Sequence, residues 1–93
     1  MVDFLVHRDG DHVGVAVRDI KKNEHVSGKT VDGQFSYELD AVQDIPLGHK
    51  IALRDIQKGE KIVEYGEIIG VATDNIAKGA HVHVHNIRSL RWG

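Results

Sequence analysis

The chain has 93 residues, which is the size of one small domain with a modest core. Lys and Arg number 12 against 14 Asp and Glu, and this near balance argues against a dedicated nucleic-acid-binding protein. Cysteine is absent, which excludes disulfides and favours a cytoplasmic location. The N-terminal segment lacks a basic region and no apolar run approaches the roughly 20 residues of a membrane span, so neither a signal peptide nor a membrane protein is expected.

Short apolar runs separated by turns that contain glycine predict a mostly β domain. Asp-Gly pairs at positions 9–10 and 32–33 are typical of tight hairpin turns. In the first half, strands are expected at 3–6, 13–17 and 35–42, with turns at 7–11 and 31–35.

One turn frame occurs four times: Ile, two residues, Gly or Asn, two residues and an aliphatic residue. The Ile is expected to anchor in the core, and Gly or Asn can adopt a positive φ at low cost. The frame therefore predicts a tight turn leading into a strand, and not a short helix. Its instances are Ile20/Asn23/Val26, Ile45/Gly48/Ile51, Ile56/Gly59/Ile62 and Ile76/Gly79/Val82.

A longer repeat contains two of these turns. Residues 14–26 align without gaps on residues 70–82, and seven of the thirteen pairs are identical. This repeat predicts two structurally equivalent halves related by a pseudo-twofold axis, and the irregular spacing of the turns excludes a solenoid.

The segment His81-Val82-His83-Val84-His85-Asn86 alternates imidazole and valine. On a strand the three histidines would share one face, about 6–7 Å apart, where they could converge on a metal ion or an anion. The alternative is an exposed strand face that tolerates polar residues. His81 is the weakest candidate, because its repeat equivalent His25 has an unremarkable context, and His83 and His85 are the stronger ones.

Two further segments carry candidate chemistry. Gly48-His49-Lys50 places an imidazole beside an ammonium group on a turn, which suits an anion site or a metal ligand unless Lys50 simply faces water. Near the C-terminus, Arg88 and Arg91 beside Trp92 could bind an anion, but docking on a partner chain is the favoured interpretation. Tyr65 is expected to be a half-buried packing residue.

Several of these segments resemble a known family. Asp55–Ile62 resembles the turn signature of SAF domains, which have a compact β-clip fold. Asp44–Leu53, Tyr65-Gly66 with Ile69-Gly70, and Gly79–Asn86 resemble the SAF module of the altronate and galactarate dehydratases. The resemblance covers nearly the whole chain and implies a single SAF-type domain over residues 1–93.

The resemblance implies the small subunit of a lyase that acts with a large catalytic subunit to eliminate water or sulfite from a hydroxy acid. A divalent metal, iron in related dehydratases, would be shared with the large subunit. His49, Lys50 and Asn86 would bind the substrate, and His83 and His85 would bind the metal. No catalytic residue is assigned to this chain, and the isolated chain is expected to be inactive.

Two other classes of function stay open at this stage. One is a free-standing module that binds sugar acids, since other SAF domains bind sialic-acid-like sugars. The other is a metal-storage or metal-sensing protein that uses the three histidines at 81, 83 and 85. A homo-oligomer of the isolated chain is also left open by the sequence.

Overall fold

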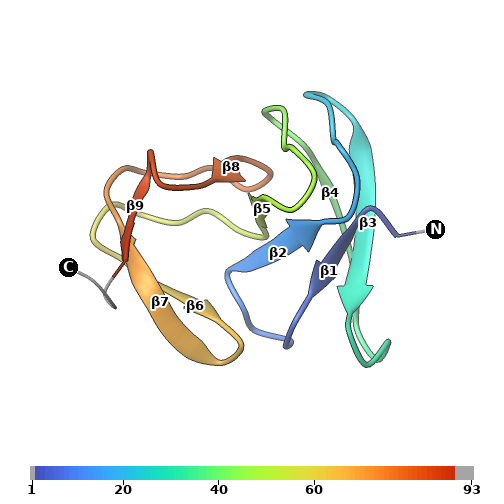
Figure 1. Cartoon of the computed structure of the whole chain (residues 1–93), viewed down its shortest axis with the longest axis horizontal. Helices are drawn as coiled ribbons and strands as arrows, with labels where there is room; N and C mark the ends of the chain where they lie inside the picture. The colour runs from blue at the N-terminus through green and yellow to red at the C-terminus, as the bar shows by residue number, and fades with distance from the viewer. Residues whose placement is uncertain (1, 90–93) are drawn as a thin grey trace.

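The computed structural model describes residues 2–89, and these form strands and turns without a helix (Figure 1). This confirms the mostly β prediction, and no helix in this range could therefore span a membrane. The strands are β1 (Phe4–Val6), β2 (Val13–Ala16), β3 (His25–Thr30), β4 (Ser36–Asp40), β5 (Lys50–Ala52), β6 (Lys61–Glu64), β7 (Glu67–Ala72), β8 (His81–Val82) and β9 (Ile87–Ser89).

The strands form two sheets. A six-stranded sheet has the order β4-β3-β1-β2-β5-β8, and a three-stranded sheet has the order β6-β7-β9. The pairing of β1 with β3 is parallel, and the other pairs are antiparallel. In the β5–β8 pair Ile51 lies opposite His81, so the His49-Lys50 segment is brought beside the histidine-rich segment.

The strands expected in the first half are observed as β1, β2 and β4, each shorter than expected, and the 31–35 turn joins β3 to β4.

The prediction of a strand over residues 81–86 is wrong, because β8 ends at Val82 and a turn follows. The side chain of Asn86 explains this turn. Its Oδ1 accepts a hydrogen bond from the His83 amide at 3.0 Å, and its Nδ2 donates to the His81 carbonyl at 2.8 Å. These bonds give the backbone an alternative to the strand ladder.

The four repeated frames form the expected tight turns. The Gly or Asn of each frame has a positive φ, which is 77° at Asn23, 83° at Gly48, 89° at Gly59 and 87° at Gly79. Asn is one of the few residues other than Gly that accept this conformation readily, so the one departure from Gly is accommodated.

The turns associate in two pairs. Ile20 forms an antiparallel bridge with Ile45, and Ile56 forms one with Ile76. In the first pair Asp19 accepts a hydrogen bond from the Leu47 amide and Asp44 accepts one from the Lys22 amide, both at 2.8 Å. The second pair has the same reciprocal bonds, in which Asp55 and Asn75 accept from the amides of residues 78 and 58. Each half of the chain thus contains one pair of hydrogen-bonded turns. The turn pairs match as the repeat predicts, whereas the sheets, with six and three strands, differ.

The interior is divided into two apolar clusters, where the sequence indicated one modest core. One cluster includes Phe4, Ile20 and Ile45, and the other includes Ile56 and Ile76. The division arises because each turn pair buries its own two isoleucines. Full burial of such a side chain stabilises the fold by about 1.5–3 kcal/mol.

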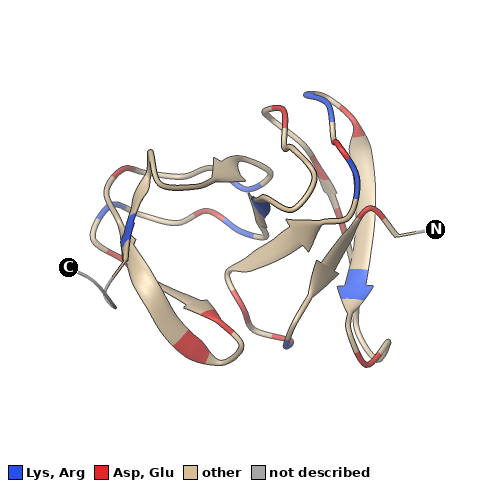
Figure 2. Ribbon diagram, in the orientation of Figure 1, with Lys and Arg blue, Asp and Glu red and all other residues tan. Residues whose placement is uncertain are grey.

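Charged residues of both signs are interspersed along the turns and the outer strands (Figure 2). One group lies on the exposed side of the β3–β4 hairpin, where His25 is flanked by two carboxylates. Its Nδ1 is 2.7 Å from Asp40 Oδ1 and its Nε2 is 2.8 Å from Glu38 Oε1. The hydrogen bonds to Glu38 and Asp40 raise the pKa of His25 above its ordinary value of 6.5.

This arrangement predicts a pH-dependent contribution to stability. Because the pKa of His25 is higher in the folded chain, the contribution is fully present below about pH 6.5 and is lost as the pH rises through the folded pKa. We expect His25→Gln to lower the urea midpoint of unfolding at about pH 5.5 and to have a smaller effect at about pH 9. A difference between variant and wild type that stays constant over this range would contradict the assignment.

Candidate functional site

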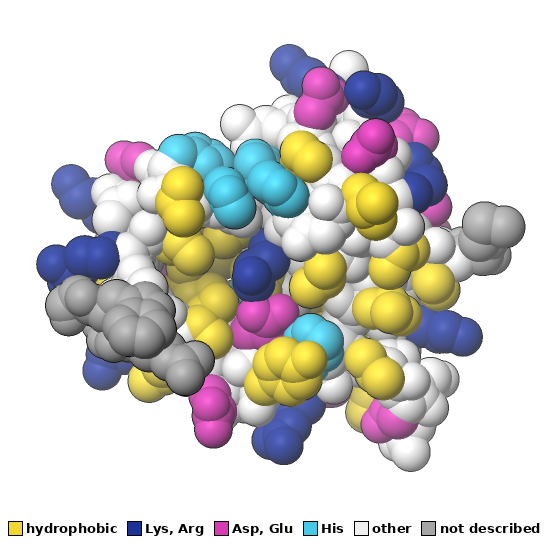
Figure 3. Space-filling model, viewed as in Figure 1, with side chains coloured by type: hydrophobic (Ala, Val, Ile, Leu, Met, Phe, Trp, Pro, Cys, Tyr) yellow, Lys and Arg dark blue, Asp and Glu magenta, His cyan; other side chains and the backbone are white. Residues whose placement is uncertain are grey.

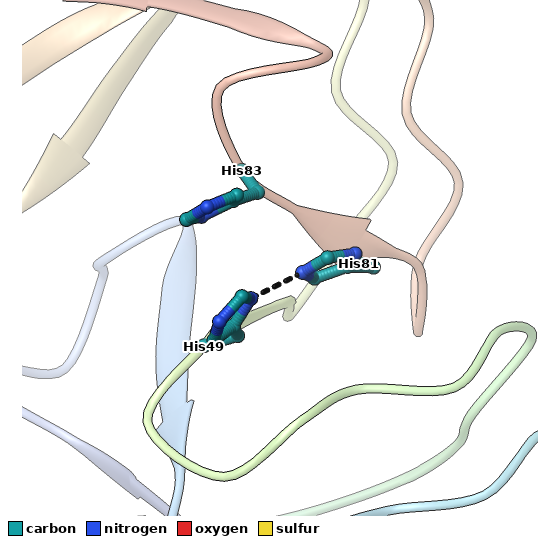
Figure 4. A group of neighbouring side chains, drawn as sticks. All are labelled: His49, His81 and His83. Carbon is teal, nitrogen blue, oxygen red and sulfur yellow. Dashed lines mark hydrogen bonds between the residues drawn. The ribbon is translucent and has the colours of Figure 1, made fainter.

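Three histidines from two distant segments converge on one point (Figure 4). His49 precedes β5, His81 lies in β8 and His83 lies in the turn after β8. A hydrogen bond of 2.8 Å joins His49 Nδ1 to His81 Nε2, and the rings of His49 and His83 stack with centroids 4.3 Å apart. One ring nitrogen of each of the three lies within 4.8 Å of the others. We call this group the histidine trio.

The backbone fixes the trio from both sides. The amide of Gly48 donates to the Ala16 carbonyl and the His49 carbonyl accepts from the Ala16 amide, both at 2.9 Å, so His49 is anchored to β2. The amide of His81 donates to Gln43 Oε1 at 2.9 Å. In the turn held by Asn86, the ring of His83 stacks on that of His49.

The surroundings of His81 and His83 favour neutral imidazoles. Partial burial lowers the pKa of His81, and the neighbouring histidines His49, His85 and His83 lower it further. The pKa of His83 is lowered by desolvation and then by His49, His85 and Lys50. Neutral imidazole is the form that binds a metal ion, because one ring nitrogen then offers a lone pair.

The residues present fit a divalent transition metal. Imidazole nitrogens suit zinc, copper, iron and nickel, and three protein ligands leave a coordination position for a substrate or water. The hydrogen bond between His49 Nδ1 and His81 Nε2 shows that two of the nitrogens that could bind the metal already face one another.

The trio differs from the metal ligands that the sequence indicated. His83 belongs to it, whereas His85 lies outside it, with its ring 5.1 Å from that of His81. His49, expected to contact substrate, is a member. His81, ranked weakest from the sequence, bonds directly to His49. The pairing of His81 with Ile51 across two strands is the signal that sequence reasoning lacked.

The other predicted substrate residues have different surroundings. Asn86 is buried, and its amide is used within the turn, so its part is to position His83. Lys50 is one-third exposed, with Nζ 3.8 Å from Glu64 Oε1. Arg88 lies exposed on β9, and Arg91 and Trp92 fall outside the described residues.

A hollow of about 380 Å³ contains the Lys50–Glu64 pair. Glu64 is almost completely buried, and its second oxygen is 3.5 Å from His7 Nε2. Figure 3 shows histidine side chains gathered at the edge of a hollow that has apolar walls and contains charged side chains of both signs. The residues lining it are Lys50, Glu64, Glu67, Ile68, Ile69, Ile87 and Ser89. No local sequence pattern predicts that Glu64 is buried.

Tyr65, expected to be a half-buried packing residue, is 56% exposed, and its ring stacks on His7 with centroids 3.6 Å apart. A larger depression of about 590 Å³ lies over the Ile56–Ile76 turn pair. The Asp55 and Asn75 oxygens there are used in the turns' own hydrogen bonds, so the hollow beside the histidines is the better candidate for chemistry.

Comparison with known proteins gives matches along the whole chain. The (2R)-sulfolactate sulfo-lyase subunit alpha of Chromohalobacter salexigens is 36% identical over 92 residues, which are 98% of each chain. The altronate dehydratases of Bacillus subtilis and Escherichia coli are 37% and 44% identical over 89 and 79 residues. Those residues are only 17% and 15% of the two dehydratases, so the chain corresponds to a small part of each.

The match to a family model agrees with these relatives and with the turn motifs. Residues 2–90 match the altronate/galactarate dehydratase SAF domain, and this range includes all the described strands. The chain therefore belongs to the altronate/galactarate dehydratase SAF domain family.

Proposed function

We propose that this chain is the small subunit of a lyase that eliminates sulfite from (2R)-sulfolactate to give pyruvate. The observation that carries this proposal is the end-to-end correspondence with a sulfo-lyase subunit alpha, which covers 98% of both chains. A protein named as an alpha subunit implies another subunit. We assign the other part of the active site, including the base that removes the proton next to the carboxylate, to a large catalytic chain.

The small subunit supplies binding groups for this reaction. His49, His81 and His83 would hold a divalent metal, for which we propose iron. A metal bound there would act as a Lewis acid that stabilises negative charge developing on substrate oxygens. Lys50 would bind an anionic group of the substrate, since its ammonium lies in the hollow beside the trio. The Lys50–Glu64 pair holds that ammonium in position.

The small subunit of an altronate dehydratase is the second candidate. The 44% identity to the Escherichia coli enzyme over 79 residues favours it. The same binding groups would serve because a sugar acid also has a carboxylate with a hydroxyl group beside it. Only the leaving group, water in place of sulfite, would differ.

Co-purification followed by assay tests the proposal. The tagged chain is purified from its native extract, and a larger chain is expected in equal molar amount. The complex should release sulfite from sulfolactate, and the isolated chain should not. Dehydration of altronate by the complex would favour the second candidate. Turnover by the isolated chain, or its recovery without a larger chain at several salt concentrations, would contradict the subunit assignment.

A further inference from the structure

We infer that the face bearing the histidine trio and the hollow is the docking surface for the large catalytic chain, which closes the hollow when it binds. This inference rests on the proposed function and adds to it the place and the chemistry of the interface. Four exposed apolar side chains lie on segments next to the polar groups, and we call them the rim: Leu47, Tyr65, Ile68 and Val84.

Each rim residue is tied to the candidate site by sequence or by contact. Leu47 is two residues before His49, and Val84 lies in the same turn as His83. The exposed fractions of Leu47 and Val84 are 61% and 79%. Large apolar side chains so exposed are common singly, but a group of them around polar residues marks an interaction surface.

The other two rim residues lie on the far side of the hollow. Ile68 is 49% exposed and lines the hollow directly. Tyr65 stacks on His7, which pairs with Glu64 inside the hollow. The rim thus extends from the trio to the His7 side, and a partner that covers it would remove the enclosed polar groups from water.

The charges on this face have the distribution of an interface. Most Lys, Arg, Asp and Glu side chains lie toward the edges of the face, and the centre is apolar or histidine apart from the pair in the hollow (Figure 3). The centres of protein interfaces are depleted of charge and enriched in aromatic and apolar residues, with a polar periphery.

The family relatives identify the occupant. In two altronate dehydratases the matching segment is 17% and 15% of a much longer chain, so there the domain is covalently joined to a large polypeptide. The alpha subunit that this chain matches over 98% of both lengths is a separate chain, so under the proposed function the association is non-covalent. A second copy of this chain is the competing occupant, and the test below distinguishes it from the large chain.

Closure over the hollow would change its chemistry. The Lys50–Glu64 pair, at 3.8 Å, is now reached by solvent from one side. Exclusion of water lowers the local dielectric constant, which strengthens interactions between these charges and a bound anion. The small subunit alone therefore presents half of a site.

The test uses the large chain that co-purifies in the experiment above. Leu47→Asp and Val84→Asp are introduced into the small chain, with Val31→Asp as the matched control. Val31 has the same 61% exposure as Leu47, but it lies at the β3–β4 hairpin, at the opposite end of the six-stranded sheet from β8. Each rim variant should weaken binding of the large chain by about 30-fold, because the edge of the hollow would lie near the centre of the interface. The control should weaken binding by less than about twofold.

Hydroxyl-radical footprinting gives a second measurement on the wild-type complex. Tyr65 should lose its reactivity on binding, and Phe35, which is 47% exposed beside Val31, should keep it. Co-purification of a large chain whose affinity is unchanged by both rim variants, or weakened equally by Val31→Asp, would overturn the docking surface and leave the proposed function standing. A homodimer that both rim variants dissociate would also overturn it. Absence of any large chain would overturn the two together.

Discussion

Replacing His81 by alanine is expected to weaken Zn²⁺ binding by the isolated chain by at least about 100-fold, because it removes a direct ligand from the trio. In the assembled lyase the same change should reduce turnover by a similar factor. His49→Ala and His83→Ala should behave in the same way, since each contributes one of the converging nitrogens. Titration calorimetry measures the affinity, with Zn²⁺ as a redox-inert probe.

Two other histidines provide the controls for this experiment. His25→Ala changes the repeat equivalent of His81, which is exposed and paired with carboxylates, and should leave Zn²⁺ affinity unchanged. His85→Ala separates the two ligand assignments, because the sequence indicated His83 with His85 and the structure indicates the trio. If His85→Ala costs as much as His83→Ala while His49→Ala costs nothing, the trio is not the metal site.

Replacing Gly79 by alanine is expected to destabilise the fold by about 3–5 kcal/mol, a large part of the roughly 5–14 kcal/mol typical of a domain this size. Gly79 has a φ of 87°, which disfavours any residue with a Cβ. An added Cβ would also clash with the Asp40 carbonyl oxygen, so the backbone would have to move. Urea unfolding followed by circular dichroism measures the loss, and thermal unfolding should show a Tm that is lower by about 4–8 °C per kcal/mol.

Gly59→Ala is the matched control for Gly79→Ala. Gly59 has nearly the same φ, 89°, at the same position of another turn, but nothing lies within 4 Å of a Cβ built there. Its substitution should cost only the conformational penalty of about 1–2 kcal/mol. Equal losses for the two variants would show that the contact with Asp40 contributes nothing.

The turns could be predicted from the sequence because their determinants are local. The Ile-x-x-Gly frame specifies a buried side chain and a positive φ within four residues, and the structure confirms all four turns. The repeat pointed to two matching halves for the same reason, although it could not show that Ile20 pairs with Ile45 and Ile56 with Ile76.

The candidate site was only partly predicted, because its geometry depends on contacts between distant residues. Alternation of His and Val suggested a strand, but the side chain of Asn86 gives the backbone a turn after Val82. His49 meets His81 through the register of β5 and β8, which no local pattern specifies. Burial of Glu64 likewise follows from packing around the hollow and not from its neighbours in the chain.

The matched turn pairs have an evolutionary consequence. Residues 14–26 and 70–82 keep the pattern that a duplicated segment would have, down to a histidine at the same place in each copy. In one copy that histidine lies between Glu38 and Asp40 at the surface, and in the other it contacts His49. Since the turn in each copy is held by a different partner turn, one copy could acquire a new role for its histidine without disturbing the turn of the other.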